Sequence, residues 1–288
     1  MGSSESKEVE RDEIIIEDDE PGADDALTCM LRVNLSRLIM YAESADVKLQ
    51  RQVAEKLANE AVKLHRQVQI VELGGLKLLL PLTQSPDIEV QRLAAHALAN
   101  LSVNAENQIL MAEEGGIEML VSILRSPHEL LQRQASKALA NLGVNPYNKV
   151  KIARAGGIPA LIKLAGSANE TVGVEAVAAL ANLAVNDDNE LEIVRLGGLG
   201  PILDGARSSN VELQSQSARA LRNLSVSAAN KERIRAGDGI KALRALVASP
   251  NQRISQQAAR ALANLDQGDA QRQRGQPGGG ATTPPAGK

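Results

Sequence analysis

The sequence predicts an all-α protein built as a solenoid of repeated units, and three observations support this prediction. An asparagine recurs every 41 residues along most of the 288-residue chain. A glycine recurs with the same spacing. Aromatic residues make up only 1% of the chain, so the core depends on Leu, Ile, Val and Ala, which favours closely packed helices over sheets. A shared period indicates tandem units, and units of this size stack on their neighbours to bury their apolar faces.

The two markers have simple local contexts. The asparagine lies in Ala-Asn-Leu or a close variant, at Asn59, Asn100, Asn141, Asn182, Asn223 and Asn264. The glycine closes a Gly-Gly pair in most units, at Gly75, Gly116, Gly157, Gly198 and Gly239.

One unit illustrates the three helices that we expect in each. A short segment with apolar spacing, residues 107–111, ends at Gly115-Gly116, where glycine permits a turn. A second helix over 117–124 is closed by Ser126-Pro127. A longer third helix over 130–142 carries apolar or small residues three and four positions apart, the spacing of a helix face.

Two residues depart from the pattern. Pro81 falls inside a second helix, where proline costs about 3 kcal/mol unless the helix ends or kinks there. Asp238 replaces the first glycine of the fifth pair, so we expect a different turn geometry at that position.

The short first helix, the Gly-Gly turn and the asparagine on the third helix resemble the armadillo repeat, from about residue 35 to residue 265. The resemblance implies a right-handed α-solenoid of about six armadillo repeats with a 41-residue period. We place an acidic disordered tail at 1–25, the repeat domain at 26–267 and a Gly/Pro-rich disordered tail at 268–288. The domain begins with a degenerate capping repeat, about 26–66, whose first helix is expected near Asp25–Val33. The last third helix is expected to end near Leu265, capped by its own polar face or by a partner.

In the armadillo proteins that recognise peptides, the third helices line a concave groove and their asparagine amides bind the backbone of an extended peptide. The resemblance implicates Asn100, Asn141, Asn182, Asn223 and Asn264. A carboxamide offers both a donor and an acceptor, so it can replace a strand partner. The alternative is that each asparagine cross-links the backbones of neighbouring repeats, and both roles can coexist.

Basic residues flank these asparagines. Positions four before the asparagine lie one turn back on nearly the same face, and they include His96, Lys137, Arg219 and Arg260. Positions eight before add Arg51, Arg92 and Arg133. Nuclear-import adaptors of this family typically have tryptophan four before the asparagine, and this chain has none, so we do not expect it to bind basic nuclear-localisation peptides in that way. Guanidinium groups favour acidic or phosphorylated ligands. The alternative is that these are solvated helix charges of little energetic consequence.

The N-terminal tail has its own pattern. Residues 1–25 hold eleven acids against Lys7 and Arg11, and Ile14–Ile16 directly precede Glu17–Glu20. This arrangement resembles a motif that binds ubiquitin-like modifiers. Alternatively, the acidic segment occupies the basic groove and competes with partners, or the tail is solubilising and disordered.

Catalytic and cofactor chemistry are not indicated. Cys29 is the only cysteine, and His65, His96 and His128 fall in separate units without metal-ligand spacing. The Gly-Gly pairs lack the context of a phosphate loop. We therefore predict no enzyme activity, no cofactor and no metal, and a small-molecule ligand is not favoured. Nucleic acid is not expected either, since base-stacking aromatics are missing.

The predicted function is a non-catalytic scaffold or adaptor that binds an extended acidic or phosphorylated protein segment, from a partner or from the chain's own tail. A cytoplasmic location is expected, with the nucleus as an alternative, because no apolar run approaches the roughly 18 residues of a membrane helix. Residues 1–6 fit the myristoylation pattern at Gly2, although such a start also occurs as a cloning leader. An acylated, peripherally membrane-tethered armadillo adaptor is thus one alternative function. A cytoskeletal module, similar to the armadillo tails of plant-type kinesins, is the other.

Overall fold

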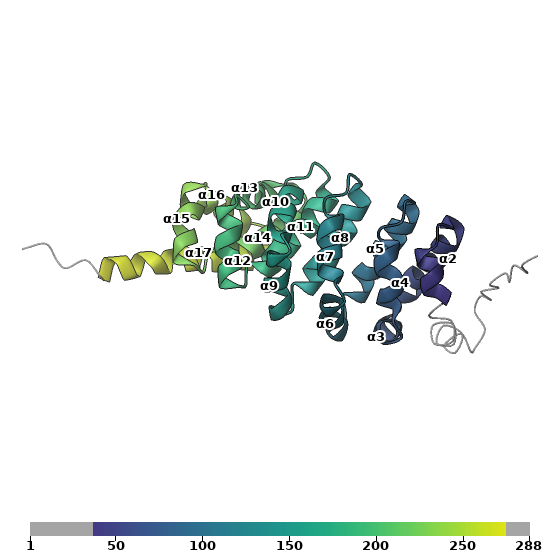
Figure 1. Ribbon diagram of the computed structural model, residues 1–288. Helices are drawn as coiled ribbons and strands as arrows, with labels where there is room; N and C mark the ends of the chain where they lie inside the picture. Colours follow the sequence, from purple (N-terminus) through teal and green to yellow (C-terminus); the bar gives the residue numbers. More distant parts are fainter. Residues whose placement is uncertain (1–36, 275–288) are drawn as a thin grey trace, which may run out of the picture.

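A computed structural model describes residues 37–274 of the chain, with side chains up to residue 267, and within these residues all regular structure is helical. The units follow one another from α2 at one end to α17 at the other (Figure 1). The predicted all-α solenoid of three-helix units is confirmed.

Each complete unit contains two short helices and one longer helix. The first helices are α3 (Leu64–Glu72), α6 (Ala105–Glu113), α9 (Pro146–Arg154), α12 (Asp187–Arg195) and α15 (Ala228–Ala236). The second helices are α4 (Gly75–Leu82), α7 (Gly116–Ile123), α10 (Gly157–Ala165), α13 (Leu199–Arg207) and α16 (Gly239–Val247). The third helices are α2 (Val47–Ala61), α5 (Ile88–Leu101), α8 (Glu129–Leu142), α11 (Glu170–Leu183), α14 (Val211–Leu224) and α17 (Gln252–Arg274).

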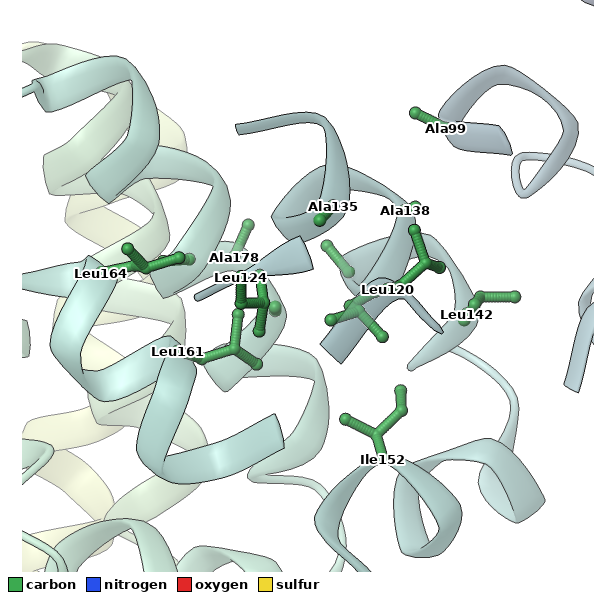
Figure 2. Packing of buried hydrophobic residues seen from close by; sticks show 14 of the residues in the cluster. Ala99, Leu120, Leu124, Ala135, Ala138, Leu142, Ile152, Leu161, Leu164 and Ala178 are labelled. Atoms are coloured by element: carbon green, nitrogen blue, oxygen red, sulfur yellow. The ribbon is translucent and has the colours of Figure 1, made fainter. Parts of the chain in front are cut away.

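The third helices form a continuous layer, since each packs against the third helix of the next unit. Beneath them lies one apolar core that runs through all units. Figure 2 shows a section of it, with Leu120 of α7, Leu142 of α8, Ile152 of α9 and Leu161 of α10 among the side chains that fill it. Alanines such as Ala135 and Ala138, both fully buried, let neighbouring helices approach closely. The core therefore needs no aromatic side chains.

Side-chain caps begin most of the first and third helices. Asn104 accepts hydrogen bonds from the backbone N–H groups of Glu106 and Asn107, and Asn145 does the same for the next unit. Asp87 caps α5 through the Val90 N–H. These carboxamides and carboxylates satisfy donors that a helix N-terminus leaves unpaired, so they determine where each helix starts.

The two glycines of a pair have separate roles. Gly156 has φ +80°, a left-handed conformation that glycine adopts without steric cost. Gly157 has an ordinary backbone, but a Cβ atom there would lie 2.8 Å from the Ile152 carbonyl oxygen, so only glycine fits between the first and second helices. The pair therefore combines a turn requirement with a packing requirement.

The turn at Asp238 corrects our expectation of a different geometry. Asp238 has φ 61° and ψ 18°, the same left-handed conformation as the first glycine of the other pairs. Aspartate tolerates this region better than most residues because its short polar side chain interacts locally. The fifth turn keeps the shape of the others, with Gly239 still in the position that lacks room for a Cβ atom.

Pro81 lies inside α4, one residue before the helix ends at Leu82. The missing N–H of proline therefore removes a hydrogen bond only at the end of the helix. Thr83 follows as the C-cap, with its N–H directed at the carbonyls of Leu79 and Leu80. Of the two outcomes that we expected at this proline, the helix ends there and does not kink.

The two ends of the solenoid differ. At the N-terminal end, residues 37–43 are helical and bury Leu38 and Ala42. The cap helix predicted near Asp25–Val33, together with Cys29, lies outside the described residues.

At the C-terminal end, α17 corrects the expectation of a stop near Leu265. The helix continues to Arg274, so the boundary that we drew at 268 falls within it. A single glycine, Gly268, costs about 1 kcal/mol in a helix, and the residues around it (266–274) are mostly good helix formers. The exposed side of α17 is largely polar, with Arg253, Gln256 and Arg260 in solvent, and it caps the last unit.

Candidate functional site

The recurring asparagines lie on the exposed side of the third-helix layer, which we call the asparagine face. Asn59 of α2 is exposed, and those of the five later third helices are half-buried. The five asparagines that we predicted as peptide contacts therefore lie on one surface, and all five are half-buried. They are Asn100, Asn141, Asn182, Asn223 and Asn264.

Four of these asparagines link their repeat to the one before. Each donates a hydrogen bond from Nδ2 to a backbone carbonyl 42 residues earlier. The pairs are Asn141 with Ala99, Asn182 with Ala140, Asn223 with Ala181 and Asn264 with Arg222, at 3.3, 2.7, 2.7 and 3.3 Å. The inter-repeat role that we considered as an alternative is thus present, and the ligand role stays a prediction.

The side-chain oxygens of these asparagines are used differently. Those of Asn141, Asn182 and Asn264 accept no hydrogen bond among the described residues and are not sealed from solvent. That of Asn223 accepts from its neighbour Arg222, whose Nε and Nη2 lie 3.1 and 2.8 Å away. Three members of the row therefore present an acceptor for an incoming N–H group.

Asn100 departs from the row because of His96. Its Nδ2 lies 3.2 Å from His96 Nε2, one turn back on α5. Burial lowers the pKa of His96 below its ordinary 6.5, and the charges of Lys137, Arg92 and Arg133 lower it further. The imidazole is therefore neutral at pH 7 and accepts the amide hydrogen. His96 does not contribute the positive charge suggested by its place among the basic residues.

Two of the predicted arginines are neutralised by acids. Arg92 makes a two-pronged contact with Glu89 on its own helix, at 2.8 and 2.6 Å. Arg51 contacts Asp87 of the next unit at 2.9 Å. The α2–α5 part of the asparagine face is therefore close to charge balance.

Arg219 is half-buried, and its Nη2 donates to the Ala178 carbonyl of α11 at 3.1 Å. Burial lowers the pKa of this guanidinium, with smaller effects from Arg253 and Arg222. Part of its donor capacity is thus used inside the solenoid.

The remaining predicted cations have no hydrogen bond or ion pair with the residues that the structure describes: Arg133 and Lys137 on α8 and Arg260 on α17. Glu175 of α11 is near the first two, since their charges lower its pKa against the opposing and larger effect of burial. Available positive charge on the asparagine face is concentrated at α8 and α17.

Two hollows open between neighbouring third helices. The hollow between α14 and α17, about 340 Å³, is lined by Arg222, Asn223, Val226, Arg260, Ala263 and Asn264. The hollow between α2 and α5, about 470 Å³, is lined by Arg51, Glu55, Ala58, Asn59, Glu89, Arg92, Leu93 and His96. Both bring together asparagines and cations that the sequence placed one unit apart. Another hollow, about 400 Å³, lies near the second-helix ends around Pro86 and Pro127, and it contains no predicted site residue.

A second asparagine row was missed by the sequence interpretation. These asparagines lie on the first helices, are at most 3% exposed and again recur every 41 residues. Each donates from Nδ2 to the backbone carbonyl 40 residues earlier. The pairs are Asn107 with Gln67, Asn148 with Gln108, Asn189 with Lys149 and Asn230 with Glu190, at 2.9, 2.8, 3.2 and 3.3 Å. The common period was visible in the sequence, and it marks a structural ladder.

Several other predictions concern residues outside 37–274. Gly2, the acidic run of the tail and its isoleucines lie there, so the structure does not place them. Within the described part, no group of three His, Cys, Asp or Glu side chains is arranged to hold a metal ion. Among those residues there is also no helix long and apolar enough to cross a bilayer.

Comparisons with known proteins agree with this geometry. A search of curated proteins finds no match. An engineered protein solved by the Northeast Structural Genomics Consortium is 33% identical, with a TM-score of 0.76, covering 82% of this chain and 97% of that one. A designed armadillo repeat protein is 27% identical, with a TM-score of 0.75, covering 80% and 99%. Another, solved in complex with the peptide (KR)4, is 26% identical, with a TM-score of 0.74 and the same coverage.

The Armadillo/beta-catenin-like repeat matches residues 65–103, 104–144, 145–185 and 186–226, which together make up more than half of the chain. These four segments coincide with consecutive three-helix units of the structure. The chain belongs to the armadillo-repeat family.

Proposed function

We propose that this protein is a non-catalytic scaffold whose asparagine face binds an extended, acidic or phosphorylated protein segment. The observation that carries the proposal is the row of half-buried asparagines with open side-chain oxygens. In Asn141, Asn182 and Asn264 one N–H is used to join two repeats, which holds the amide in a fixed orientation. A preorganised acceptor binds at lower entropic cost than a mobile one.

The spacing of the row suits an extended chain. Packed helices lie about 8–10 Å apart, and an extended chain advances about 3.3 Å per residue. Successive asparagines therefore correspond to every third residue of the bound segment. The designed armadillo repeat protein that was solved with a peptide supports this general mode of use.

The side chains beside the asparagine row indicate which charge a ligand should carry. The peptide in that designed protein is basic. Here Arg133, Lys137 and Arg260 stand beside the asparagines without a hydrogen bond or ion pair among the described residues, and Glu175 lies near the first two. Arginine forms paired hydrogen bonds with carboxylate and phosphate, so an acidic or phosphorylated segment fits this surface better than a basic one.

The test compares two peptides of opposite charge by fluorescence anisotropy: four Glu-Asp pairs and four Lys-Arg pairs. We expect the acidic peptide to bind the full chain, with affinity that falls as salt is raised. Changing Arg133→Glu together with Lys137→Glu weakens it about tenfold or more. Lys241→Glu, an exposed cation on α16, is the matched control and leaves affinity unchanged. Tighter binding of the basic peptide, or equal losses in the control, contradicts the proposal.

We propose that the protein is located in the cytoplasm, as expected from the sequence, with the nucleus as the alternative. The membrane-tethered adaptor depends on Gly2, so mass spectrometry of the mature N-terminus decides it. The cytoskeletal module is decided by co-sedimentation with microtubules. Neither alternative gains support from the residues that the structure describes.

A further inference from the structure

Five exposed valines form a second row beside the asparagines. Each lies three residues after a recurring asparagine, just past the end of a third helix, and each is between 51% and 66% exposed. The row consists of Val62, Val103, Val144, Val185 and Val226, each separated from the next by 41 residues. We call it the valine row. Single exposed aliphatic residues are ordinary, but these five recur with the period of the repeat and so line up along the solenoid.

The valine row belongs to the same surface as the asparagines. In the hollow between α14 and α17, Val226 is in the lining together with Asn223, Asn264 and Arg260. The other four valines occupy the same position in the sequence of their own units, three residues after the asparagine. A segment that lies on the asparagine face at this hollow therefore meets amide, cation and aliphatic side chain together.

One segment of the chain matches this combination. Residues 14–20 read Ile-Ile-Ile-Glu-Asp-Asp-Glu, an aliphatic run followed directly by an acidic run. In an extended chain Ile14 and Ile16 point to the same side, about 7 Å apart, close to the separation of neighbouring helices. The acids complement Arg133 and Lys137, which make no hydrogen bond or ion pair among the described residues.

The connection to the solenoid is long enough. Sixteen residues, 21–36, separate this segment from the first described residue, and they span up to about 50 Å when extended. That length covers several repeats, including α8 with its two cations.

From the valine row, the cations and this reach we infer that residues 14–20 occupy the asparagine face of the same chain, with the isoleucines on the valine row. The inference rests on the proposed function, because both use one surface. A tethered segment has an effective concentration near the millimolar range, so it competes strongly with segments of partners.

The test uses the full chain and a fluorescent peptide of residues 10–22. Replacing Ile14, Ile15 and Ile16 by serine in the chain removes the tethered competitor, and we expect the peptide to bind that chain about tenfold more tightly than the original. In the same background, Val103→Ser with Val144→Ser weakens binding about fivefold. Val211→Ser, at an exposed valine that begins α14, is the matched control and has no effect.

The outcomes separate this inference from the proposed function. A peptide with serines for its isoleucines that binds as well as the original refutes the role of the valine row, while acid binding stands. If peptide 10–22 fails to bind although the Glu-Asp peptide binds, the inference also falls alone. If neither acidic peptide binds, both fall. A concentration-dependent dimer in sedimentation, lost in the triple-serine chain, would place the segment on a second copy and overturn occupancy within one chain.

Discussion

Arg222 donates two hydrogen bonds to the side-chain oxygen of its neighbour Asn223, from Nε at 3.1 Å and from Nη2 at 2.8 Å. The other units have alanine before the third-helix asparagine. In three of these units, at Asn141, Asn182 and Asn264, the side-chain oxygen of the asparagine is open to solvent. One substitution in a repeated phrase therefore removes one acceptor from the asparagine face.

Restoring the common phrase by Arg222→Ala is expected to free that acceptor. A bound segment then gains a hydrogen bond at α14, worth about 0.5–1.5 kcal/mol, or roughly a two- to tenfold gain in affinity. The loss of one positive charge acts in the opposite direction, and raising the salt concentration reduces this second effect. The measurement is binding of the Glu-Asp peptide at about 0.3 M salt, and weaker binding than the original chain would contradict the prediction.

The two asparagine rows are expected to respond differently to alanine substitution. Asn148→Ala removes the buried hydrogen bond to the Gln108 carbonyl and leaves space where the buried side chain packed, which costs about 1–3 kcal/mol of unfolding free energy. Asn182→Ala exposes the Ala140 carbonyl on a surface that water reaches, so the cost is below about 1 kcal/mol.

Urea unfolding of both variants, together with peptide affinity, tests this separation. Asn182→Ala should lower affinity with little change in stability, and Asn148→Ala should do the reverse. Equal losses of stability would mean that the half-buried row has a mainly structural role.

The architecture could be predicted from the sequence because every unit carries the same residues at its turns and helix starts. Gly156-Gly157 marks a turn, and Asn145 marks a helix start, wherever the units stand. The site was less predictable. The sequence brought Arg92 and Lys137 to one face, but charge pairing depends on side-chain distances: Arg92 has Glu89 at 2.6 Å, and Lys137 has no such contact among the described residues.

Two expectations, the turn geometry at Asp238 and the end of the last helix, are wrong for reasons that depend on single residues. Asp238 stands where the pattern has a glycine, and an aspartate adopts the same left-handed turn. Gly268 suggests a helix end, but one glycine among helix-forming residues only weakens the helix, and α17 continues to Arg274. In each case the weaker preference of one residue is overridden by its neighbours.

Asp238 leads to a stability prediction. A left-handed conformation costs a non-glycine residue of order 1 kcal/mol, so Asp238→Gly is expected to raise the free energy of unfolding by up to that amount. Asp238→Ala should lower it, since alanine lacks the short polar side chain that eases this conformation. Urea unfolding measures both. An alanine variant as stable as the glycine variant would show that the turn is not strained.

Glu190 of α12 is an acid at a position where the two preceding units have hydrogen-bond donors. Gln108 donates to the Ser102 carbonyl at 3.2 Å, and Lys149 donates to the Val144 carbonyl at 2.7 Å. An ionised carboxylate has no hydrogen to donate. Burial raises the pKa of Glu190 to about 7, and the charge of Asp187 adds to the effect.

This shift sets the sign of a pH dependence. The folded chain holds the proton more tightly than the unfolded chain, whose glutamates titrate near about 4.3. The contribution of Glu190 to the unfolding free energy is therefore highest below about pH 4.5, falls as the pH rises toward 7, and stays lower above it. The loss is at most about 4 kcal/mol, at about 1.4 kcal/mol per pKa unit.

Glu190→Gln keeps the shape of the side chain and supplies a permanent donor, as Gln108 does two units earlier. The variant is expected to be more stable than the original chain at pH 8 and nearly equal to it at pH 5, because only the original must release a buried proton. Urea unfolding at the two pH values measures this difference, and Asp188→Asn, an exposed acid on the same helix, is the control. An equal gain at both pH values would mean that the carboxyl is ionised throughout, and that the donor alone accounts for the change.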